Sequence, residues 1–189
     1  VTSLPDFDIH SNRVPITPSD FIEMIRLQIS ESDFDLFSTL QYQFDNTNLV
    51  SILEGRDFFD TRACLTKNFL EAECKTPVYL PDYMKDFVES FKLQQRKYPK
   101  YSLEDELSIF YFEYIKSKNS DFLTNFIKFE FNLRNVLAAL NCRKYNLSLE
   151  NKILLFDKEE SELLLVNSTA DFGLSRHYDW INDVINYYS

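Results

Sequence analysis

Residues 171–176 read Asp-Phe-Gly-Leu-Ser-Arg, which copies the magnesium-binding signature of protein kinases. A kinase also needs a glycine-rich loop over the nucleotide phosphates and a His-Arg-Asp catalytic loop upstream. The sequence has 2 glycines, Gly55 and Gly173, so a glycine-rich loop cannot form. We therefore predict a structural turn here, with Gly173 at positive φ and Asp171 as its capping residue.

Other residues that could do chemistry are scattered. His10 and His177 lie at opposite ends of the chain, and Cys64, Cys74 and Cys142 form no Cys-x-x-Cys pair. These spacings fit neither a zinc site nor a disulfide framework and favour reduced thiols. The acidic runs 104–106 and 159–160 fall in predicted first turns of helices, where the helix dipole stabilises them without catalysis. We expect no enzyme activity, no cofactor and no metal site.

Composition favours a folded protein with protein partners. Of the 189 residues, 44% are hydrophobic and 16% aromatic, which is enough for one sizeable core. A net charge of −10 argues against nucleic acid and anionic lipid as partners. It serves solubility or complements a basic protein partner. No apolar run reaches the ~18–20 residues of a membrane span, and no signal peptide is recognisable, so we expect a cytoplasmic protein without membrane insertion.

The elements that must position these residues are predicted to be helices. Thr17 and Ser30 each begin a capping box and start the two helices of a helical hairpin. Further helices are expected at 46–54 (ending at Gly55), 62–73, 81–94, 102–118, 121–145, 159–166 and 178–188. We predict a loop at 147–156, with a β-hairpin arm or an interrupted helix as alternatives. The apolar face of 102–118 (Leu103, Leu107, Phe110, Tyr111 and Tyr114) is expected to pack against 121–145.

Segment 121–145 is apolar on most sides. Only a narrow polar ridge interrupts its apolar faces, formed by Asn125, Lys128, Asn132 and Asn135. A helix of this kind is predicted to lie inside a bundle. One of its apolar faces comprises Phe122, Phe126, Phe129, Leu133, Val136, Leu137 and Leu140.

Part of this segment is repeated upstream in the sequence, and we call this internal similarity the echo. At an offset of 87 residues, segment 44–58 aligns with 131–145 and the pairs Phe44/Phe131, Asn48/Asn135, Leu53/Leu140 and Arg56/Arg143 are identical. Because the matches keep helical phase, we infer an internal repeat, with units 17–94 and 102–189 in a single helical domain 1–189. The two asparagines would satisfy backbone groups inside the bundle, and Arg56 and Arg143 would cap helix C-termini.

The shared pattern is Phe-(Asp/Asn)-x-x-Asn followed by two aliphatic residues and Leu-x-x-Arg. It resembles a helix pattern of the C subunit (the d subunit of eukaryotes) of rotary V/A-type ATPases. The chain is more similar still to a bacterial family that is encoded beside V-type ATPase genes and thought to stand in for that component. The matching stretches are 1–6, 44–49, 104–105, 129–145 and 170–174. Members of that family begin with a short strand and continue past the position of Ser189 into further helices.

The resemblance implies an all-α bundle built from helical units like those of the ATPase C subunit. It implies a non-catalytic component that couples the membrane rotor ring to the central shaft in ATP-driven ion transport. The location implied is cytoplasmic, at the inner membrane through the complex. A helical protein–protein adaptor unrelated to the ATPase is the main alternative, and an enzyme with an atypical site is the third.

Three groups of residues are candidates for partner contact. The basic loop 95–101 carries Arg96, Lys97 and Lys100 and is either solvated or bound to an acidic partner. Arg134, Arg143 and Lys144 would reach an acidic partner from one end of segment 121–145, unless Arg134 pairs with Glu130. Around segment 178–188 we expect an exposed apolar patch, because Trp180, Ile181, Ile185 and Tyr188 share one helix face. The alternative is that this helix packs fully onto the core.

Overall fold

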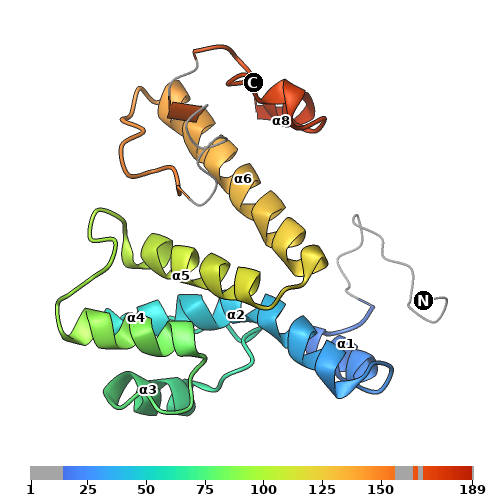
Figure 1. Cartoon of the computed structure of the whole chain (residues 1–189), viewed down its shortest axis with the longest axis vertical. Coiled ribbons are helices and arrows are strands. Elements are labelled where there is room, and N and C mark those ends of the chain that lie inside the picture. Colours follow the sequence, from blue (N-terminus) through green and yellow to red (C-terminus); the bar gives the residue numbers. More distant parts are fainter. Residues whose placement is uncertain (1–14, 156–163, 166–167, 189) are drawn as a thin grey trace. The chain divides into compact units, whose positions relative to one another are not determined.

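All regular structure in the described residues is helical (Figure 1). The computed structural model describes residues 15–155, 164–165 and 168–188, so most of the predicted helix 159–166 lies outside them. The prediction of an all-α fold is confirmed. In chain order the elements are α1 (Pro18–Arg26), α2 (Glu31–Leu53), α3 (Lys67–Lys75), α4 (Asp82–Lys92), α5 (Leu103–Ser117), α6 (Asp121–Lys144), the 3₁₀ turn η1 (Leu174–Arg176) and α8 (Ile181–Tyr188).

Hydroxyl side chains cap the N-termini of α1, α2 and α5, and the caps of α1 and α2 are the two capping boxes predicted from the sequence. The Thr17, Ser30 and Ser102 hydroxyls accept hydrogen bonds from the N–H groups three residues on, at 3.2, 3.1 and 3.1 Å. In α1 and α2 the hydroxyl also donates to the carboxylate of that third residue, at 2.7 Å in both cases. Each contact satisfies a backbone donor that the helix leaves unpaired.

The helices between residues 31 and 75 differ from the prediction. Residues 31–53 form one continuous helix, α2, so the separate third helix expected at Asn46 is wrong. Nothing between residues 41 and 47 breaks a helix, since this stretch contains neither glycine nor proline. The predicted stop is confirmed, because Gly55 follows with φ +68°. The next helix covers Lys67–Lys75 instead of 62–73.

The chain folds as two compact units, residues 1–75 and 76–189. Their boundary differs from those of the expected repeat units 17–94 and 102–189, and the single domain stays a prediction. In unit 1 the core lies where the second half of α2 meets α3, and Leu49, Val50 and Leu70 are completely buried there.

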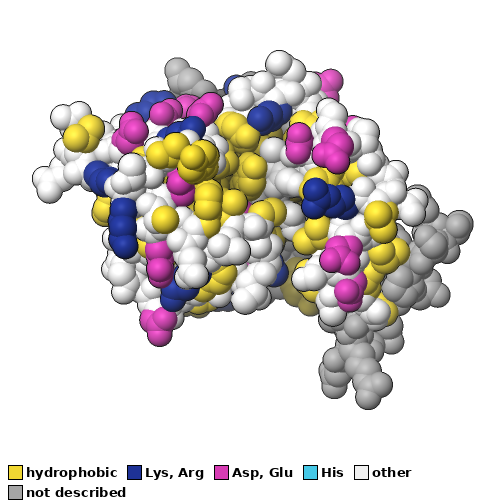
Figure 2. Space-filling view, turned by 90° about the horizontal axis from the view of Figure 1, so that it is seen from below, with side chains coloured by type: hydrophobic (Ala, Val, Ile, Leu, Met, Phe, Trp, Pro, Cys, Tyr) yellow, Lys and Arg dark blue, Asp and Glu magenta, His cyan; other side chains and the backbone are white. Residues whose placement is uncertain are grey.

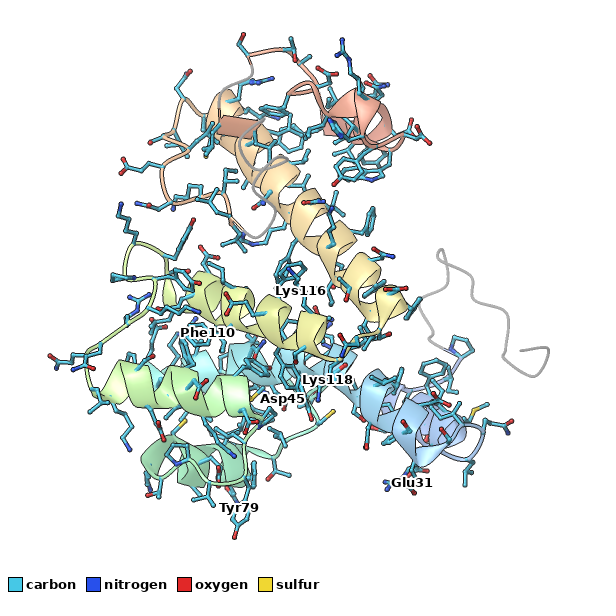
Figure 3. All side chains as sticks on the ribbon, in the orientation of Figure 1. Glu31, Asp45, Tyr79, Phe110, Lys116 and Lys118 are labelled. Carbon is cyan, nitrogen blue, oxygen red and sulfur yellow. The ribbon has the colours of Figure 1, made fainter. Side chains whose placement is uncertain are left out.

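In unit 2, α4 and α5 lie side by side through aromatic rings (Figure 1). Phe87 meets Phe110 edge-on at 6.0 Å between ring centres, and Tyr83 lies 5.8 Å from Tyr111 and 4.8 Å from Tyr114. Phe110 therefore lies between α5 and α4, as Figure 3 shows. Three residues of the α5 face that the pattern predicts to pack on α6, namely Phe110, Tyr111 and Tyr114, pack on α4. The helix α5 does contact α6 as predicted, but through a different residue, since the Phe112 ring lies 5.8 Å from that of Phe131.

The second half of α6 supports another core cluster. Its members come from α6, the following loops and the start of α8: Val136, Ala139, Leu140, Ile153, Leu164, Phe172, Leu174 and Ile181. Because α8 contributes its first residue to this cluster, the helix is held beside the second half of α6 (Figure 1).

Asp45 is a buried carboxylate in α2 (Figure 3). Its oxygens accept the N–H groups of Cys64 at 3.2 Å and Leu65 at 2.8 Å, which ties the α2–α3 connection to the helix. Burial raises the pKa of Asp45 to about 6, because it outweighs the lowering by these two hydrogen bonds. Burial and the neighbouring Asp45 charge raise the pKa of the Cys64 thiol to about 11.

We predict that Asp45 makes the protein less stable as the pH rises. The pKa is higher in the folded chain, about 6, than its ordinary value of 3.8, so the folded state binds the proton more tightly. Stability from this group is therefore present below pH 4 and lost as the pH rises through 6, by roughly 3 kcal/mol in total. Urea unfolding of the wild type and Asp45→Asn at pH 4, 5, 6 and 7 isolates the effect from other carboxyl groups. A stability difference that stays constant over these pH values would contradict the prediction.

Candidate functional site

The two identical asparagines of the echo make the same contact. Asn48 Nδ2 donates to the carbonyl oxygen of Asp60 at 2.9 Å, and its Oδ1 accepts the N–H of Asp60 at 2.6 Å. Asn135 Nδ2 donates to the carbonyl oxygen of Leu154 at 3.0 Å, and its Oδ1 accepts the N–H of Leu154 at 2.9 Å. Each buried amide thus holds both polar groups of one backbone residue in the loop that follows its helix. We call this contact the asparagine clamp, and it confirms the expected role of the two residues.

The arginines of the echo do not correspond in this way. Arg56 follows the end of α2 and pairs with Glu54 at 2.7 Å, whereas Arg143 lies within α6. Arg143 Nη1 donates to the carbonyl oxygens of Thr169 at 3.0 Å and Ala170 at 3.3 Å. The expectation that Arg143 caps a helix C-terminus is therefore wrong, because these carbonyl groups belong to a later loop. Equivalence of the two repeat units as wholes stays a prediction.

The Asp-Phe-Gly motif is a turn, as predicted. Asp171 accepts the hydroxyls of Ser175 at 2.5 Å and Thr169 at 2.6 Å and the N–H of Gly173 at 3.0 Å. These donors, Ser175 first, hold the pKa of Asp171 well below its usual range. Phe172 and Gly173 have φ of +55° and +73°, and the buried Phe172 ring lies 4.0 Å beneath the Arg143 guanidinium.

The basic loop is bound to its own chain. Arg96 Nε donates to Glu106 Oε2 at 2.5 Å, and the other oxygen of this completely buried carboxylate accepts the Tyr98 N–H at 2.8 Å. Arg96 thus has an internal structural contact, and its role in partner binding stays a prediction. Lys97 pairs with Glu113 at 3.1 Å. Lys100 is exposed, and its role in partner binding stays a prediction.

The cations of α6 also contact their own chain. Arg134 pairs with Asp105 of α5 and not with Glu130, the alternative partner. Lys144 lies 5.0 Å from the ring centre of Tyr188 in α8. Together with the Arg143 contacts, these interactions hold the middle and the C-terminal end of α6 to neighbouring parts of unit 2.

The predicted C-terminal patch is only partly exposed. Ile181 is completely buried in the core cluster, so its assignment to an exposed patch is wrong. Trp180 is half-buried, with its ring 5.4 Å from Phe129 and 5.2 Å from Tyr178. Ile185 is also partly buried against the cluster.

Another apolar surface, which is more exposed than the predicted C-terminal patch, lies along α6. Phe122, Phe126 and Phe129 are 69, 38 and 43% exposed, and we call these three residues the aromatic strip. Further along the helix, a groove of about 420 Å³ separates α6 from α8. Its lining residues are Leu133, Leu137, Asp183, Val184, Tyr187 and Tyr188.

The sequence pattern assigns the aromatic strip to the core. Phe122, Phe126, Phe129, Leu133 and Leu137 follow the spacing of one helix face, as predicted. The first half of this face is exposed, whereas Leu133 and Leu137 are half-buried and line the α6–α8 groove. The buried face of this part of α6 is the adjacent one, which carries Leu123 and Ile127. These two aliphatic residues are the sequence signal that could have shown which of the two apolar faces is buried.

The described residues contain neither a metal-ligand cluster nor a membrane-spanning helix. No three His, Cys, Asp or Glu side chains in this part of the chain are grouped so that they could hold a metal ion. None of the helices it contains is both long and apolar enough to cross a membrane.

The described residues define an all-helical protein in which an asparagine clamp fixes the loop after each of two helices and α6 presents an apolar face. The chain belongs to the family described as "Protein of unknown function (DUF2764)", whose model matches residues 1–189.

An uncharacterized protein of Chlamydia muridarum (strain MoPn / Nigg) is similar to this chain. The two are 22% identical over 176 residues, which cover 88% of this chain and 64% of the relative. The chain thus spans less than two thirds of that relative's length. No solved structure matches the chain.

Proposed function

We propose that this protein is a non-catalytic component of a V/A-type rotary ATPase, similar to the C subunit of such enzymes. In this role it couples the membrane rotor ring to the central shaft during ATP-driven ion transport. The observation that carries the proposal is the asparagine clamp, because it occurs at Asn48 and Asn135, in the two segments that carry the resemblance. The protein would lie on the cytoplasmic side of the inner membrane, held there by the complex.

A coupling subunit must keep its contacts under torque. Exposed ion pairs suit this purpose poorly, since solvent and salt screen them, whereas broad apolar contacts are not screened in this way. The cations predicted for partner contact are, except for Lys100, engaged within the chain. The aromatic strip and the α6–α8 groove offer apolar area instead, and we assign the partner contact to them.

We predict that Phe126→Asp separates the protein from the ATPase. A charge in the middle of the strip must be desolvated in any apolar interface, which costs several kcal/mol and lowers recovery of rotor-ring and shaft subunits at least tenfold. The full-length protein, tagged and expressed in cells that carry the ATPase genes, is purified and its partners are quantified by mass spectrometry.

Phe58→Asp is the matched control, because Phe58 is 51% exposed and lies in unit 1, outside the strip. This variant should recover the same subunits as the wild type. If the wild type recovers other proteins reproducibly and no ATPase subunit, the adaptor alternative replaces the proposal. If Phe126→Asp and Phe58→Asp recovered the ATPase subunits equally well, the aromatic strip would not be part of the interface.

A further inference from the structure

The tip of unit 1 is a helical hairpin without a core of its own. We define the hairpin tip as residues 15–38, which comprise α1, the turn after it and the first two turns of α2. None of these residues is fully buried, and the first buried residue of the described chain is Thr39. Elsewhere in unit 1, Leu49, Val50 and Leu70 are completely buried.

The half-buried residues of the hairpin tip are strongly apolar. In α1 they follow one helix face, and in α2 the rings of Phe34 and Phe37 lie 6.1 Å apart. The apolar half-buried residues are Ile16, Phe21, Ile22, Met24, Ile25, Ile29, Phe34, Leu36 and Phe37, and Leu27 beside them is 85% exposed. Two helices alone leave such faces partly open, because a helix pair buries only the seam between them.

The same tip is acidic. It contains five carboxylates and one cation, Arg26, which is occupied over the Phe34 ring at 5.1 Å. Asp20 and Asp33 are used in the capping boxes. The carboxylates of Glu23, Glu31 and Asp35 are exposed and form no ion pair or hydrogen bond with the described residues. Glu31 lies at the start of α2 (Figure 3), and on the face of the molecule shown in Figure 2 acidic and apolar side chains lie side by side.

We propose that the hairpin tip is a docking site for a basic amphipathic helix of another protein. The apolar side of that helix would cover the half-buried residues and complete a three-helix arrangement. Its lysines or arginines would lie against Glu23, Glu31 and Asp35. The charge of the tip selects this occupant, since an acidic helix, a nucleic acid or an anionic lipid surface would be repelled. The inference is independent of the ATPase role, because it rests on residues 15–38, which include neither the asparagine clamp nor any stretch that carries the resemblance.

A model peptide tests the site directly. The probe is a fluorescein-labelled helix of Leu and Lys, about 20 residues long, with the leucines on one face, and binding is followed by anisotropy at low salt. Replacing Glu23, Glu31 and Asp35 together by lysine should weaken binding at least tenfold. The matched control replaces Asp86, Glu89 and Glu150, three exposed acids of unit 2, and should change binding less than twofold. Both triple variants change exposed side chains only, so both should fold.

Amide hydrogen exchange of the unmodified protein locates the bound peptide. Saturating peptide should protect residues 18–38 and leave α4 and α5 unchanged. Equal weakening in the two triple variants, or equal binding of a peptide with the same composition but scattered leucines, would overturn the proposal. So would concentration-dependent protection of the tip without peptide, which would assign the face to a second copy of the chain.

Discussion

Replacing Asn135 by aspartate is expected to lower the free energy of unfolding by about 3 kcal/mol. The substitution keeps the size of the side chain, so it opens no cavity. A carboxylate at this position could still accept the N–H of Leu154, but it has no group to donate to the Leu154 carbonyl oxygen, now 3.0 Å from the amide nitrogen. Two acceptors would then face each other in a position where Asn135 is 1% exposed. Urea unfolding followed by Trp180 fluorescence, which reports on unit 2, measures the effect.

Two further asparagines make this test specific. Asn48→Asp breaks the other clamp in the same way and should cost unit 1 a similar free energy, measured by circular dichroism. Asn125→Asp changes an exposed residue of the same helix as Asn135 and should alter stability by less than about 0.5 kcal/mol. If Asn135→Asp were as stable as Asn125→Asp, the clamp would have no role in holding the loop.

Replacing Arg96 by methionine is expected to cost about 3–5 kcal/mol, because it leaves the Glu106 carboxylate buried without its cation. The double variant Arg96→Met/Glu106→Leu should recover much of this loss, since an apolar pair needs no charge compensation. Recovery should stay incomplete because the N–H of Tyr98 loses its acceptor at 2.8 Å. Thermal and urea unfolding of the two variants and the wild type supply the comparison.

The neighbouring surface pair is the control for this prediction. Lys97→Met breaks the half-exposed pair with Glu113 and should cost at most about 1 kcal/mol. A loss at Arg96 no larger than the loss at Lys97 would show that burial of Glu106 adds nothing to the interaction.

Local signals in the sequence predict the helices well, and long-range partners poorly. Thr17, Ser30 and Ser102 are recognisable as caps because a cap needs only residues within one turn. The prediction of a separate helix at Asn46 is wrong because polar residues in the middle of α2 resemble a new start when their buried partners in the α2–α3 connection are unknown. Asp45 and Asn48 are two such residues.

The candidate site shows the same limit. In the sequence, Arg96 resembles a residue that binds another protein, because its ion-pair partner within the chain, Glu106, cannot be recognised. The position of Glu106 in the first turn of α5 already accounts for its negative charge. Phe122 resembles a core residue because spacing identifies an apolar face without showing what covers it. The roles of Asn48 and Asn135 are predictable, since a polar residue repeated at the same helical phase indicates a backbone partner in both places.

Isolation of the intact ATPase tests the central claim most directly. The rotor ring is tagged in cells that express the native full-length protein, the complex is extracted in mild detergent, and its subunits are quantified by mass spectrometry. We expect this protein to be present in a fixed ratio to the shaft subunits and to be lost together with them when the shaft is released. A complex that contains ring and shaft, hydrolyses ATP and drives ion transport, yet contains none of this protein, would contradict this expectation.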